Sequence, residues 1–405
     1  MTDTPTIKRI LFVDDEPKIL EGLQRMLRSM RDSWEMQFAE GSENALNDLR
    51  QQEFDVVVTD MRMPGKNGAQ LLSEVRQAYP HIVRIVLSGH SDQELVLSSV
   101  GQAHQYLSKP CDPELLKQTI GRACALRDLL SNNTLMLLVS QMQTLPSLPS
   151  LYMELMHELE APEPSTKRIA AIISKDPGMT AKILQMVNSA FFGLRRHVSS
   201  PADAVNLLGI DIVKSLALSI QIFSQFANIR IPGLTLEDLW QHNMTVAVMA
   251  KKIAKSENQT QQVIEESFTA GLLHECGKLV LAARLPKEYG AMLEKVKTEQ
   301  LNVIDAERQT FGATHPEVGA YLLGLWGLPD AIVEAVAFHQ TPTQCPAEAF
   351  TPLTAVCAAD YLTDEASPNE FDSPVNAEEV SSYLTRLRLN DRLTSWRELG
   401  STDNG

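Results

Sequence analysis

The sequence has no excess of basic residues, and this absence argues against a direct nucleic-acid binder. It contains 36 Lys and Arg against 51 Asp and Glu, which gives a formal net charge of -15. Affinity for a phosphate backbone depends on clustered Lys and Arg, and no dense basic stripe lies along the chain. We therefore expect no direct contact with nucleic acid.

Paired cysteines and long apolar runs are also missing. The five cysteines are scattered without a C-x-x-C pair, which is typical of reduced, buried thiols rather than of a disulfide framework. No segment approaches the roughly 18 uninterrupted apolar residues that a membrane span requires. The first residues lack the basic and apolar regions of a signal peptide. These absences predict a cytoplasmic protein with no membrane segment.

The length and the hydrophobic pattern predict more than one domain. A chain of 405 residues exceeds what one hydrophobic core usually supports. In the first third, short apolar runs alternate with segments of helical period, which predicts a doubly wound parallel sheet with helices on both faces. The five expected strands are residues 10–13, 34–38, 54–58, 82–87 and 106–107.

Acidic residues stand where the expected strands end. Asp14 and Asp15 follow the first strand, and Asp60 follows the third. Ligands of such sheets bind at the carboxyl ends of the strands, so these carboxylates would share one crevice. They would repel each other unless a hard cation such as Mg2+ lay among them. Ser88 and Lys109 would add a hydroxyl and an ammonium. Taken singly, each aspartate is equally a turn former or a helix cap.

These residues and their order resemble the receiver domain of two-component response regulators, over residues 7 to about 125. The phrases Asp60-Met-Arg-Met-Pro and Asn67-Gly68 match as well. The resemblance implies the following roles: phosphoacceptor, Asp60; Mg2+ ligands, Asp14, Asp15, Asp60 and the backbone carbonyl of Arg62; switch hydroxyl, Ser88; switch aromatic, Tyr106; invariant lysine, Lys109. Without the resemblance, Tyr106 would be interpreted as a half-buried strand aromatic.

A long helix is expected after the receiver. Asp112 is a suitable N-cap, Pro113 suits the first helical position, and apolar residues continue at helical spacing toward residue 138. We assign residues 1–125 to the receiver and 126–143 to a helical linker. The apolar seam of this helix fits two alternatives. It forms a homodimer interface, or it packs on its own receiver and breaks near Ser131.

Beyond residue 144 the pattern becomes helical throughout. Asp176 and Pro177 begin one helix, which ends in Val187-Asn-Ser-Ala-Phe-Phe-Gly193, and residues 204–209 precede an apolar helix over 212–226. These phrases resemble the HDOD family, an all-α relative of the HD-type metal phosphohydrolases. We assign residues 144–345 to an HDOD domain and 346–405 to a helical extension with a polar tail. Asn188 and Ser189 face a partner or, more simply, cap the helix.

Six polar residues of this domain follow the order in which HD enzymes place their metal ligands: His242, His274, Glu275, His315, His339 and Asp360. Such a set of imidazoles and carboxylates can hold metal ions that activate water. Glu275 replaces an aspartate, and its extra methylene would displace an attacking hydroxide by about an ångström, at a cost of roughly a hundredfold in rate. The His-His-Glu and Gly-Tyr-Pro phrases of the HD-GYP enzymes are absent.

Three interpretations of this histidine set therefore remain: a degenerate site with buried, hydrogen-bonded histidines, a metal site without turnover, or an active phosphohydrolase. We expect the first, without a transition metal. The remaining histidines share no pattern and are expected on the surface or in loops: His81, His90, His104, His157 and His197.

Together these features predict a two-component response regulator that is not an enzyme. A histidine kinase or phosphotransfer protein would phosphorylate Asp60, and the HDOD domain would pass the signal to a downstream protein by protein–protein interaction. The alternative is a phosphorylation-gated metal phosphohydrolase that acts on a cyclic dinucleotide or another nucleotide. No helix-turn-helix pattern follows the receiver, which disfavours a transcription factor.

Overall fold

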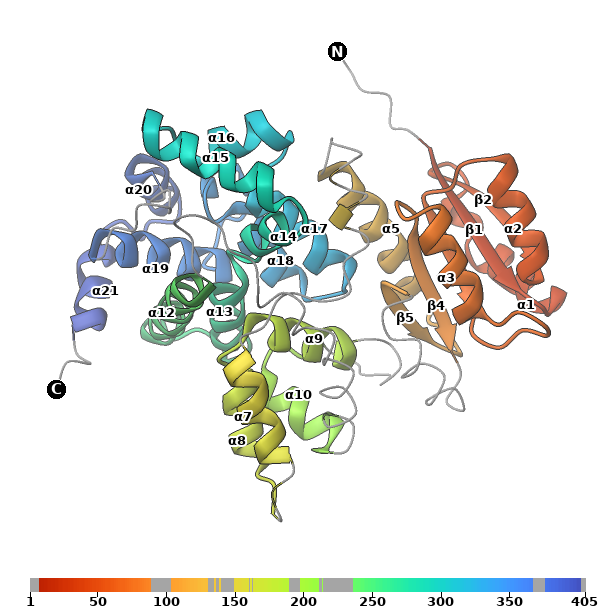
Figure 1. The fold of residues 1–405 in the computed structure, drawn as a ribbon, viewed down its shortest axis with the longest axis horizontal. Coiled ribbons are helices and arrows are strands. Elements are labelled where there is room, and N and C mark those ends of the chain that lie inside the picture. Colours follow the sequence, from red (N-terminus) through yellow and green to blue (C-terminus); the bar gives the residue numbers. More distant parts are fainter. Residues whose placement is uncertain are drawn as a thin grey trace. The chain divides into compact units, whose positions relative to one another are not determined.

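The chain forms two compact units, and each has its own fold (Figure 1). The computed structural model describes residues 7–88, 103–129, 135, 138–139, 149–159, 161, 163–188, 197–210, 213, 236–366 and 376–401. The first unit contains residues 1–143, and the second contains most of the chain from Thr144 to Gly405. Within the described ranges, no helix is both long enough and apolar enough to cross a bilayer.

A parallel sheet of five strands forms the centre of the first unit, in the order β2-β1-β3-β4-β5. Every neighbouring pair of strands runs parallel, so the predicted doubly wound α/β fold is confirmed. The strands are β1 (Lys8–Asp14), β2 (Trp34–Glu40), β3 (Val56–Asp60), β4 (Val83–Ser88) and β5 (Gln105–Ser108).

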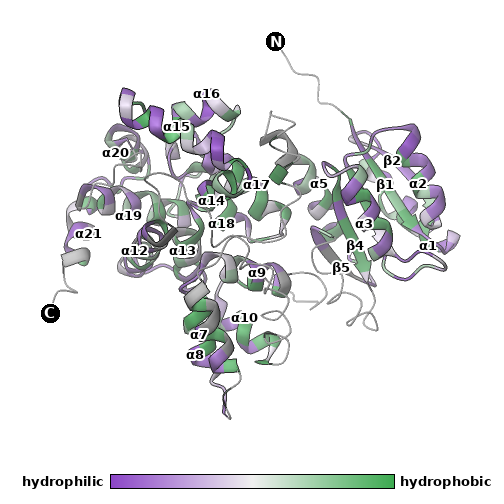
Figure 2. Ribbon diagram, viewed as in Figure 1, coloured by the Kyte–Doolittle hydropathy of each residue, from purple (hydrophilic) through white to green (hydrophobic). Residues whose placement is uncertain are grey.

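Helices cover the sheet because both of its faces are apolar. Alternate side chains of a strand point to opposite faces, and Leu11, Val57 and Val86 share one buried cluster with residues of α2 and α3. On the other face, α1 packs against β1 and α5 packs against β3. Figure 2 shows β1 coloured mainly hydrophobic and α2 largely hydrophilic, as expected for a strand in the core and a helix at the surface.

The helices of this unit begin at well-defined caps. Asn67 and Gln70 form a capping box at α3, and the Asp112 carboxylate accepts the backbone N–H groups of Glu114 and Leu115 at the start of α5. The helical segments are α1 (Pro17–Met26), η1 (Arg28–Met30), α2 (Gly41–Gln51), α3 (Gly68–Ala78) and α5 (Pro113–Leu129). The linker segment that follows α5, from residue 130 to residue 134, lies outside the described residues.

The described part of the second unit is helical throughout, which confirms an all-α domain. Asp176 caps α9 as predicted, with its Oδ1 accepting the N–H of Met179 at 2.8 Å. The helices are α7 (Pro149–Leu159), α8 (Thr166–Ile173), α9 (Pro177–Asn188), α10 (Pro201–Leu208), α12 (Leu236–Ser256), α13 (Gln261–Leu273), α14 (Cys276–Arg284), α15 (Pro286–Glu299), α16 (Val303–Phe311), α17 (His315–Leu325), α18 (Asp330–Phe338), η5 (Pro342–Gln344), α19 (Pro352–Ala366), α20 (Ala377–Arg386) and α21 (Arg392–Ser401).

Three of these helices form the centre of the second unit. Helix α12 packs against both α13 and α19, and α13 also packs against α18 and α19. Close approach of α12 and α13 depends on Gly271, because a Cβ there would lie 2.8 Å from the Cα of Ala247. The predicted helix over 212–226, and residues 189–193 of the predicted HDOD phrase, lie outside the described part of the chain.

Two features of the chain differ from the sequence-based expectations. Residues near the C-terminus form α21, in which Trp396 is buried and its indole N–H donates to Glu257 at 2.8 Å. A single tryptophan gives no periodicity, so the pattern suggested only a polar tail. His104 is buried rather than on the surface, because the guanidinium and the backbone N–H of Arg84 both contact its ring.

Candidate functional site

The carboxyl ends of β1, β3 and β4 bring the predicted receiver residues together. β3 lies between β1 and β4, and the pairing of Asp60 with Leu87 places the end of β3 beside Ser88. β5 then ends just before Lys109, whose backbone N–H donates to the carbonyl of Ser88 at 2.7 Å. The sequence therefore folds so that side chains from four strand ends converge at one edge.

Lys109 links the two buried aspartates of this edge. Its ammonium lies 2.8 Å from Asp14 Oδ2 and also contacts Asp60 Oδ1. The backbone N–H of Arg62 donates to Asp60 Oδ2 at 2.8 Å, and that of Glu16 donates to Asp14 Oδ1 at 2.9 Å. Each of the two carboxylates is thus held by one ammonium contact and one backbone hydrogen bond.

The charges of this site shift each other's ionisation. Burial raises the pKa of Asp60 above its ordinary value, although Lys109 acts in the opposite direction. Burial alone would lower the pKa of Lys109, but its hydrogen bonds to Asp14 and Asp60 outweigh that effect and raise the pKa. One ammonium therefore offsets the charge of two carboxylates. Asp15, the residue after Asp14, adds a third carboxylate.

Two further groups complete the geometry. The Ser88 hydroxyl is buried and has no hydrogen-bond partner among the described residues. Gly68 packs so closely beneath Asp60 that a Cβ there would lie 2.0 Å from the Asp60 carbonyl oxygen. The backbone of β5 is placed, but the side chain of Tyr106 lies outside what the structure describes, so its switch role stays a prediction.

The oxygen donors of this edge fit a hard divalent cation. Asp14 and Asp60 are carboxylates at neighbouring strand ends, Asp15 follows Asp14 in the sequence, and Arg62 with its backbone carbonyl follows two residues after Asp60. Mg2+ takes oxygen ligands of this kind and keeps several waters. The metal-ligand roles of these residues remain predictions.

A second polar cluster, the histidine cluster, consists of His242, His274, Glu275, His315, His339 and Asp360 of the second unit. The residues come from α12, from the junction of α13 and α14, from the start of α17, from the end of α18 and from α19. All six, predicted from their order along the chain, are brought together in the structure. Five of them are almost fully buried, and His242 is nearly so.

One half of the cluster surrounds Asp360. His242 Nε2 lies 3.2 Å from Asp360 Oδ1, His274 Nε2 lies 3.5 Å from the same oxygen, and the two Nε2 atoms are 3.2 Å apart. The Nδ1 of His274 donates to the carbonyl of Gly271 at 2.7 Å. Burial would raise the pKa of Asp360, but His274 and His242 hold it below its usual range.

The other half surrounds Glu275. Lys278 Nζ lies 2.9 Å and His315 Nε2 lies 3.3 Å from Glu275 Oε2, while His339 Nε2 lies 3.7 Å from Oε1. Burial would raise the pKa of Glu275, yet His315 and Lys278 hold it well below its usual range. Burial lowers the pKa of His339.

Glu307 is the second carboxylate beside His315. Its Oε2 accepts the backbone N–H of His315 at 2.7 Å and lies 2.8 Å from Nδ1 of the ring. Burial alone would lower the pKa of His315, but Glu275 and Glu307 raise it to about 9. At neutral pH this imidazole is therefore a cation between two carboxylates.

The sequence analysis missed three charged residues that contact the cluster. Lys278 lies one helical turn after Glu275, and Asp364, whose Oδ1 is 4.0 Å from His242 Nδ1, lies one turn after Asp360. Helical spacing from the predicted residues would have identified both. Glu307 gave no such signal, because it lies on a different helix, and only the fold brings it to His315.

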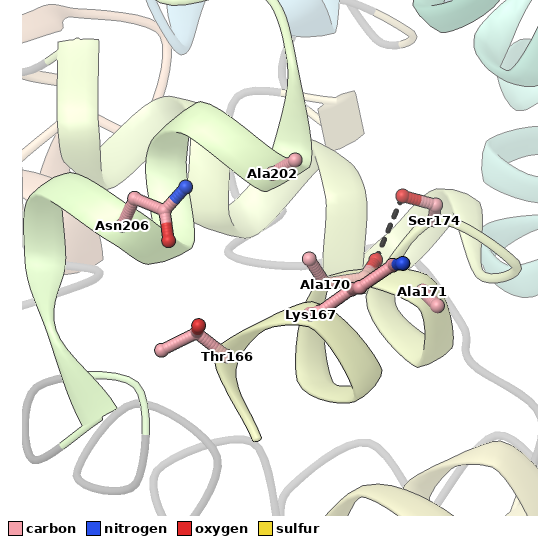
Figure 3. A pocket seen from close by; sticks show the side chains of 7 residues that line it. All are labelled: Thr166, Lys167, Ala170, Ala171, Ser174, Ala202 and Asn206. Atoms are coloured by element: carbon pink, nitrogen blue, oxygen red, sulfur yellow. Dashed lines mark hydrogen bonds between the residues drawn. The ribbon is translucent and has the colours of Figure 1, made fainter.

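The second unit also has a surface hollow of ≈ 360 Å³ between α8 and α10 (Figure 3). Its walls are mainly small side chains, and the Ser174 hydroxyl in its wall donates to the carbonyl of Ala170. The lining residues are Thr166, Lys167, Ala170, Ala171, Ser174, Ala202 and Asn206. No imidazole or carboxylate lines it, so we assign it no metal or catalytic chemistry.

Comparison with known proteins identifies the two parts. Residues 10–121 match the response regulator receiver domain, and residues 145–342 match the HDOD domain. A protein of Treponema pallidum (strain Nichols), described as uncharacterized, is 27% identical over 232 residues, which are 56% of this chain and 43% of that protein. The hydrogenase transcriptional regulatory protein HoxA of Cupriavidus necator is 36% identical over 116 residues, or 28% of this chain and 23% of HoxA. The chain thus covers less than half of either relative.

Among solved structures, the MmoQ response regulator of Methylococcus capsulatus is 26% identical, with a TM-score of 0.48, over 63% of this chain and 98% of that one. By the family matches, residues 10–121 belong to the receiver domain family and residues 145–342 belong to the HDOD family. The chain thus combines a response regulator receiver domain with an HDOD domain.

Proposed function

We propose that Asp60 accepts a phosphoryl group from a histidine kinase or a phosphotransfer protein. The observation that carries this proposal is the position of the Lys109 ammonium between Asp14 and Asp60, at the strand edge that also carries the buried Ser88 hydroxyl. A carboxylate nucleophile needs such positive charge, because its own oxygens and those of the phosphoryl group repel each other.

The residues of the chain divide the work of this transfer. An Asp60 oxygen attacks the phosphorus, the bond from phosphorus to the donor imidazole breaks, and its electron pair remains on the imidazole nitrogen. The backbone N–H of Arg62 orients the Asp60 carboxylate, and Lys109 and Ser88 bind the oxygens of the incoming phosphoryl group. Asp14, Asp15, Asp60 and the Arg62 carbonyl would hold Mg2+, which neutralises phosphoryl charge when bound.

We infer that the HDOD domain passes the signal on by binding a downstream protein. Burial of the histidine cluster supports this output, because His274, Glu275 and Asp360 are at most 1% exposed and a substrate would have no direct access. A phosphoryl group at Asp60 would pull Ser88 inward and move the Tyr106 face, which would bias either a homodimer or the contact between domains. The acidic net charge of -15 supports a partner other than nucleic acid.

Hydrogen exchange and oligomeric state test this coupling. The full chain is loaded with a small phosphodonor and Mg2+, and native protein is compared with Asp60→Ala and with Glu53→Gln, an exposed acidic control. We expect changed exchange in the second unit or a changed oligomeric state for native and Glu53→Gln protein alone. Identical behaviour of native and Asp60→Ala protein would rule out the proposed coupling.

A second candidate function is metal-dependent phosphodiester hydrolysis gated by the receiver. It is favoured by one observation, the convergence of four imidazoles and two carboxylates in the histidine cluster. The test is turnover of a cyclic dinucleotide by phosphorylated protein supplied with Mn2+. Turnover that is lost in His274→Ala and kept in His157→Ala, an exposed control, would support the enzyme. Absence of turnover in native protein would leave the binding function.

A further inference from the structure

The histidine cluster contains two groups of side chains that could each hold a metal ion, and the groups share one ligand. The first is His242, His274 and Asp360, and the second is His274, Glu275 and His339. The Nε2 of a neutral imidazole has a single lone pair, so it binds one ion at a time. With His274 common to both, the two groups exclude each other as three-ligand sites.

The side chains of the first group are already oriented to bind a metal ion. The Nδ1–H of His274 is held by the carbonyl of Gly271, which leaves the Nε2 lone pair directed at His242 and Asp360. The Asp360 carboxylate is 1% exposed, and its Oδ2 has no hydrogen-bond partner among the described residues. An orphaned carboxylate oxygen is costly in a protein interior, and a cation would satisfy it.

The second group is already occupied by a cation of the chain itself. Lys278 Nζ lies 2.9 Å from Glu275 Oε2, and both side chains are 2% exposed. A divalent ion on Glu275 would have to share that carboxylate with an ammonium at close range, and repulsion between like charges is strong in a medium of low dielectric. His339 Nε2 of the second group also has no hydrogen-bond partner among the described residues, but the carboxylate of that group has an ammonium beside it and Asp360 Oδ2 has none. The two groups therefore differ in how much a metal ion would stabilise them.

We propose that the histidine cluster binds one divalent transition-metal ion, at His242, His274 and Asp360, and that Lys278 takes the place of a second ion beside Glu275. Two imidazoles and one carboxylate suit Fe2+, Mn2+, Co2+ or Zn2+. This inference rests on the metal-binding capacity of the second candidate function and is independent of phosphorylation at Asp60. The ion would join α12, α13 and α19, which makes it a stabiliser of the helical core.

Metal stoichiometry of the full chain tests the proposal. The acidic receiver edge also fits Mn2+, so the chain measured here and in the variants below carries Asp14→Ala and Asp15→Ala. It is loaded with Mn2+, freed of excess metal and measured by elemental mass spectrometry and electron paramagnetic resonance. We expect one equivalent with the spectrum of an isolated Mn2+. Two equivalents, or a spectrum of two exchange-coupled ions, would overturn the single-ion site. No bound ion would overturn the metal site altogether, while the receiver function would be unaffected.

A matched pair of variants locates the ion. Asp360→Asn and Glu275→Gln each convert one buried carboxylate of the cluster to an amide, and we expect the ion to be lost only in Asp360→Asn. Loss of the ion in Glu275→Gln with retention in Asp360→Asn would contradict the assignment. If Asp360→Asn does not fold, His242→Ala removes a ligand from the more exposed edge of the cluster.

Lys278→Met tests whether the ammonium keeps the ion away from the second group. Because His274 serves one ion at a time, we expect Lys278→Met alone to bind one equivalent of Mn2+, and we expect Lys278→Met to restore one equivalent to the Asp360→Asn chain through the second group. An Asp360→Asn/Lys278→Met chain without a bound ion would show that Lys278 does not substitute for a metal. Thermal unfolding with and without Mn2+ gives a readout independent of any activity, because an ion bound only by the folded chain raises Tm.

Discussion

The receiver edge and the histidine cluster each hold a lysine ammonium against buried carboxylates, but they differ in their access to solvent. In the receiver, the Lys109 side chain is 29% exposed and that of Asp60 is 11% exposed. In the cluster, the side chains of Lys278 and Glu275 are each 2% exposed. The Asp60 carboxylate is therefore partly open to solvent, whereas Glu275 is enclosed by the helices of its own domain.

The two sites also differ in the balance of their charges. Among the described residues, Lys109 is the one cation that contacts Asp14 and Asp60, so this part of the receiver edge keeps an excess of negative charge. Glu275 by contrast has two cationic neighbours, Lys278 and His315. An edge with excess negative charge needs an added cation, while a compensated carboxylate does not. The comparison separates a site suited to exchange with other molecules from a site suited to hold a domain together.

Gly277→Ala is expected to have the largest effect on this comparison. A Cβ at Gly277 would lie 1.9 Å from the carbonyl oxygen of His315. The three nearest atoms all belong to the backbone, so relief of this clash requires a shift of the main chain. We expect a loss of about 3 kcal/mol in the free energy of unfolding, measured by urea titration. Gly121→Ala in α5, where nothing lies within 4 Å of the added Cβ, should be neutral or slightly stabilising. A neutral Gly277→Ala would show that the cluster is not tightly enclosed.

Gly68→Ala is the corresponding change in the receiver. Its Cβ would lie 2.0 Å from the carbonyl oxygen of Asp60, which must then shift. We expect a loss of about 1–3 kcal/mol in stability, and a shift of about an ångström at Asp60 would slow phosphorylation by roughly a hundredfold. Incorporation from a small phosphodonor measures the rate. Gly22→Ala, with nothing within 4 Å, is the control, and an equal rate in the two variants would contradict the geometry of the site.

Lys182 is a second buried lysine of the helical unit, and it allows the effect of burial on a lysine pKa to be measured. Burial lowers its pKa to about 8, whereas Lys278 lies beside a carboxylate. Between pH about 8 and about 10.4 the unfolded chain holds a proton on Lys182 that the folded chain lacks, so stability rises with pH, by up to about 1.4 kcal/mol per unit.

The variant Lys182→Met should remove this rise, and the exposed Lys167→Met should keep it. Urea unfolding of the three proteins at a series of alkaline pH values gives the slope directly. If native protein and Lys182→Met show the same slope, the Lys182 amine titrates normally and is not desolvated by the fold.

Local patterns predicted most of the fold, because local rules govern strands and helix starts. The five apolar runs became the five strands, and Asp112, Asp176 and Asn376 cap helices where capping rules place them. Helix α21 was missed, since its contacts reach residues far away in the chain: Trp396 and Arg392 contact Glu257, and Arg397 contacts Glu365. The burial of His104 was missed for the same reason, because its partner Arg84 lies on a neighbouring strand.

Residue order predicted which side chains converge in each site, but not how their charges balance. The sequence placed Lys109 beside the aspartates, and it assembled the six residues of the histidine cluster. The contact of Lys278 with Glu275 was overlooked, although the two residues lie one helical turn apart and their spacing would have indicated it. The contact of Glu307 with His315 depends on how two helices pack, which a single sequence does not encode in a short motif.

The most direct test of the account is the phosphoryl content of the receiver, measured as the intact mass of protein treated with a small phosphodonor and Mg2+. Native and Glu53→Gln chains should each gain one phosphoryl group, the Asp60→Asn chain should gain none, and chelation of Mg2+ should abolish the gain in all. A phosphoryl group on the Asp60→Asn chain, or none on the native chain, would contradict the assignment of Asp60 as the phosphoacceptor.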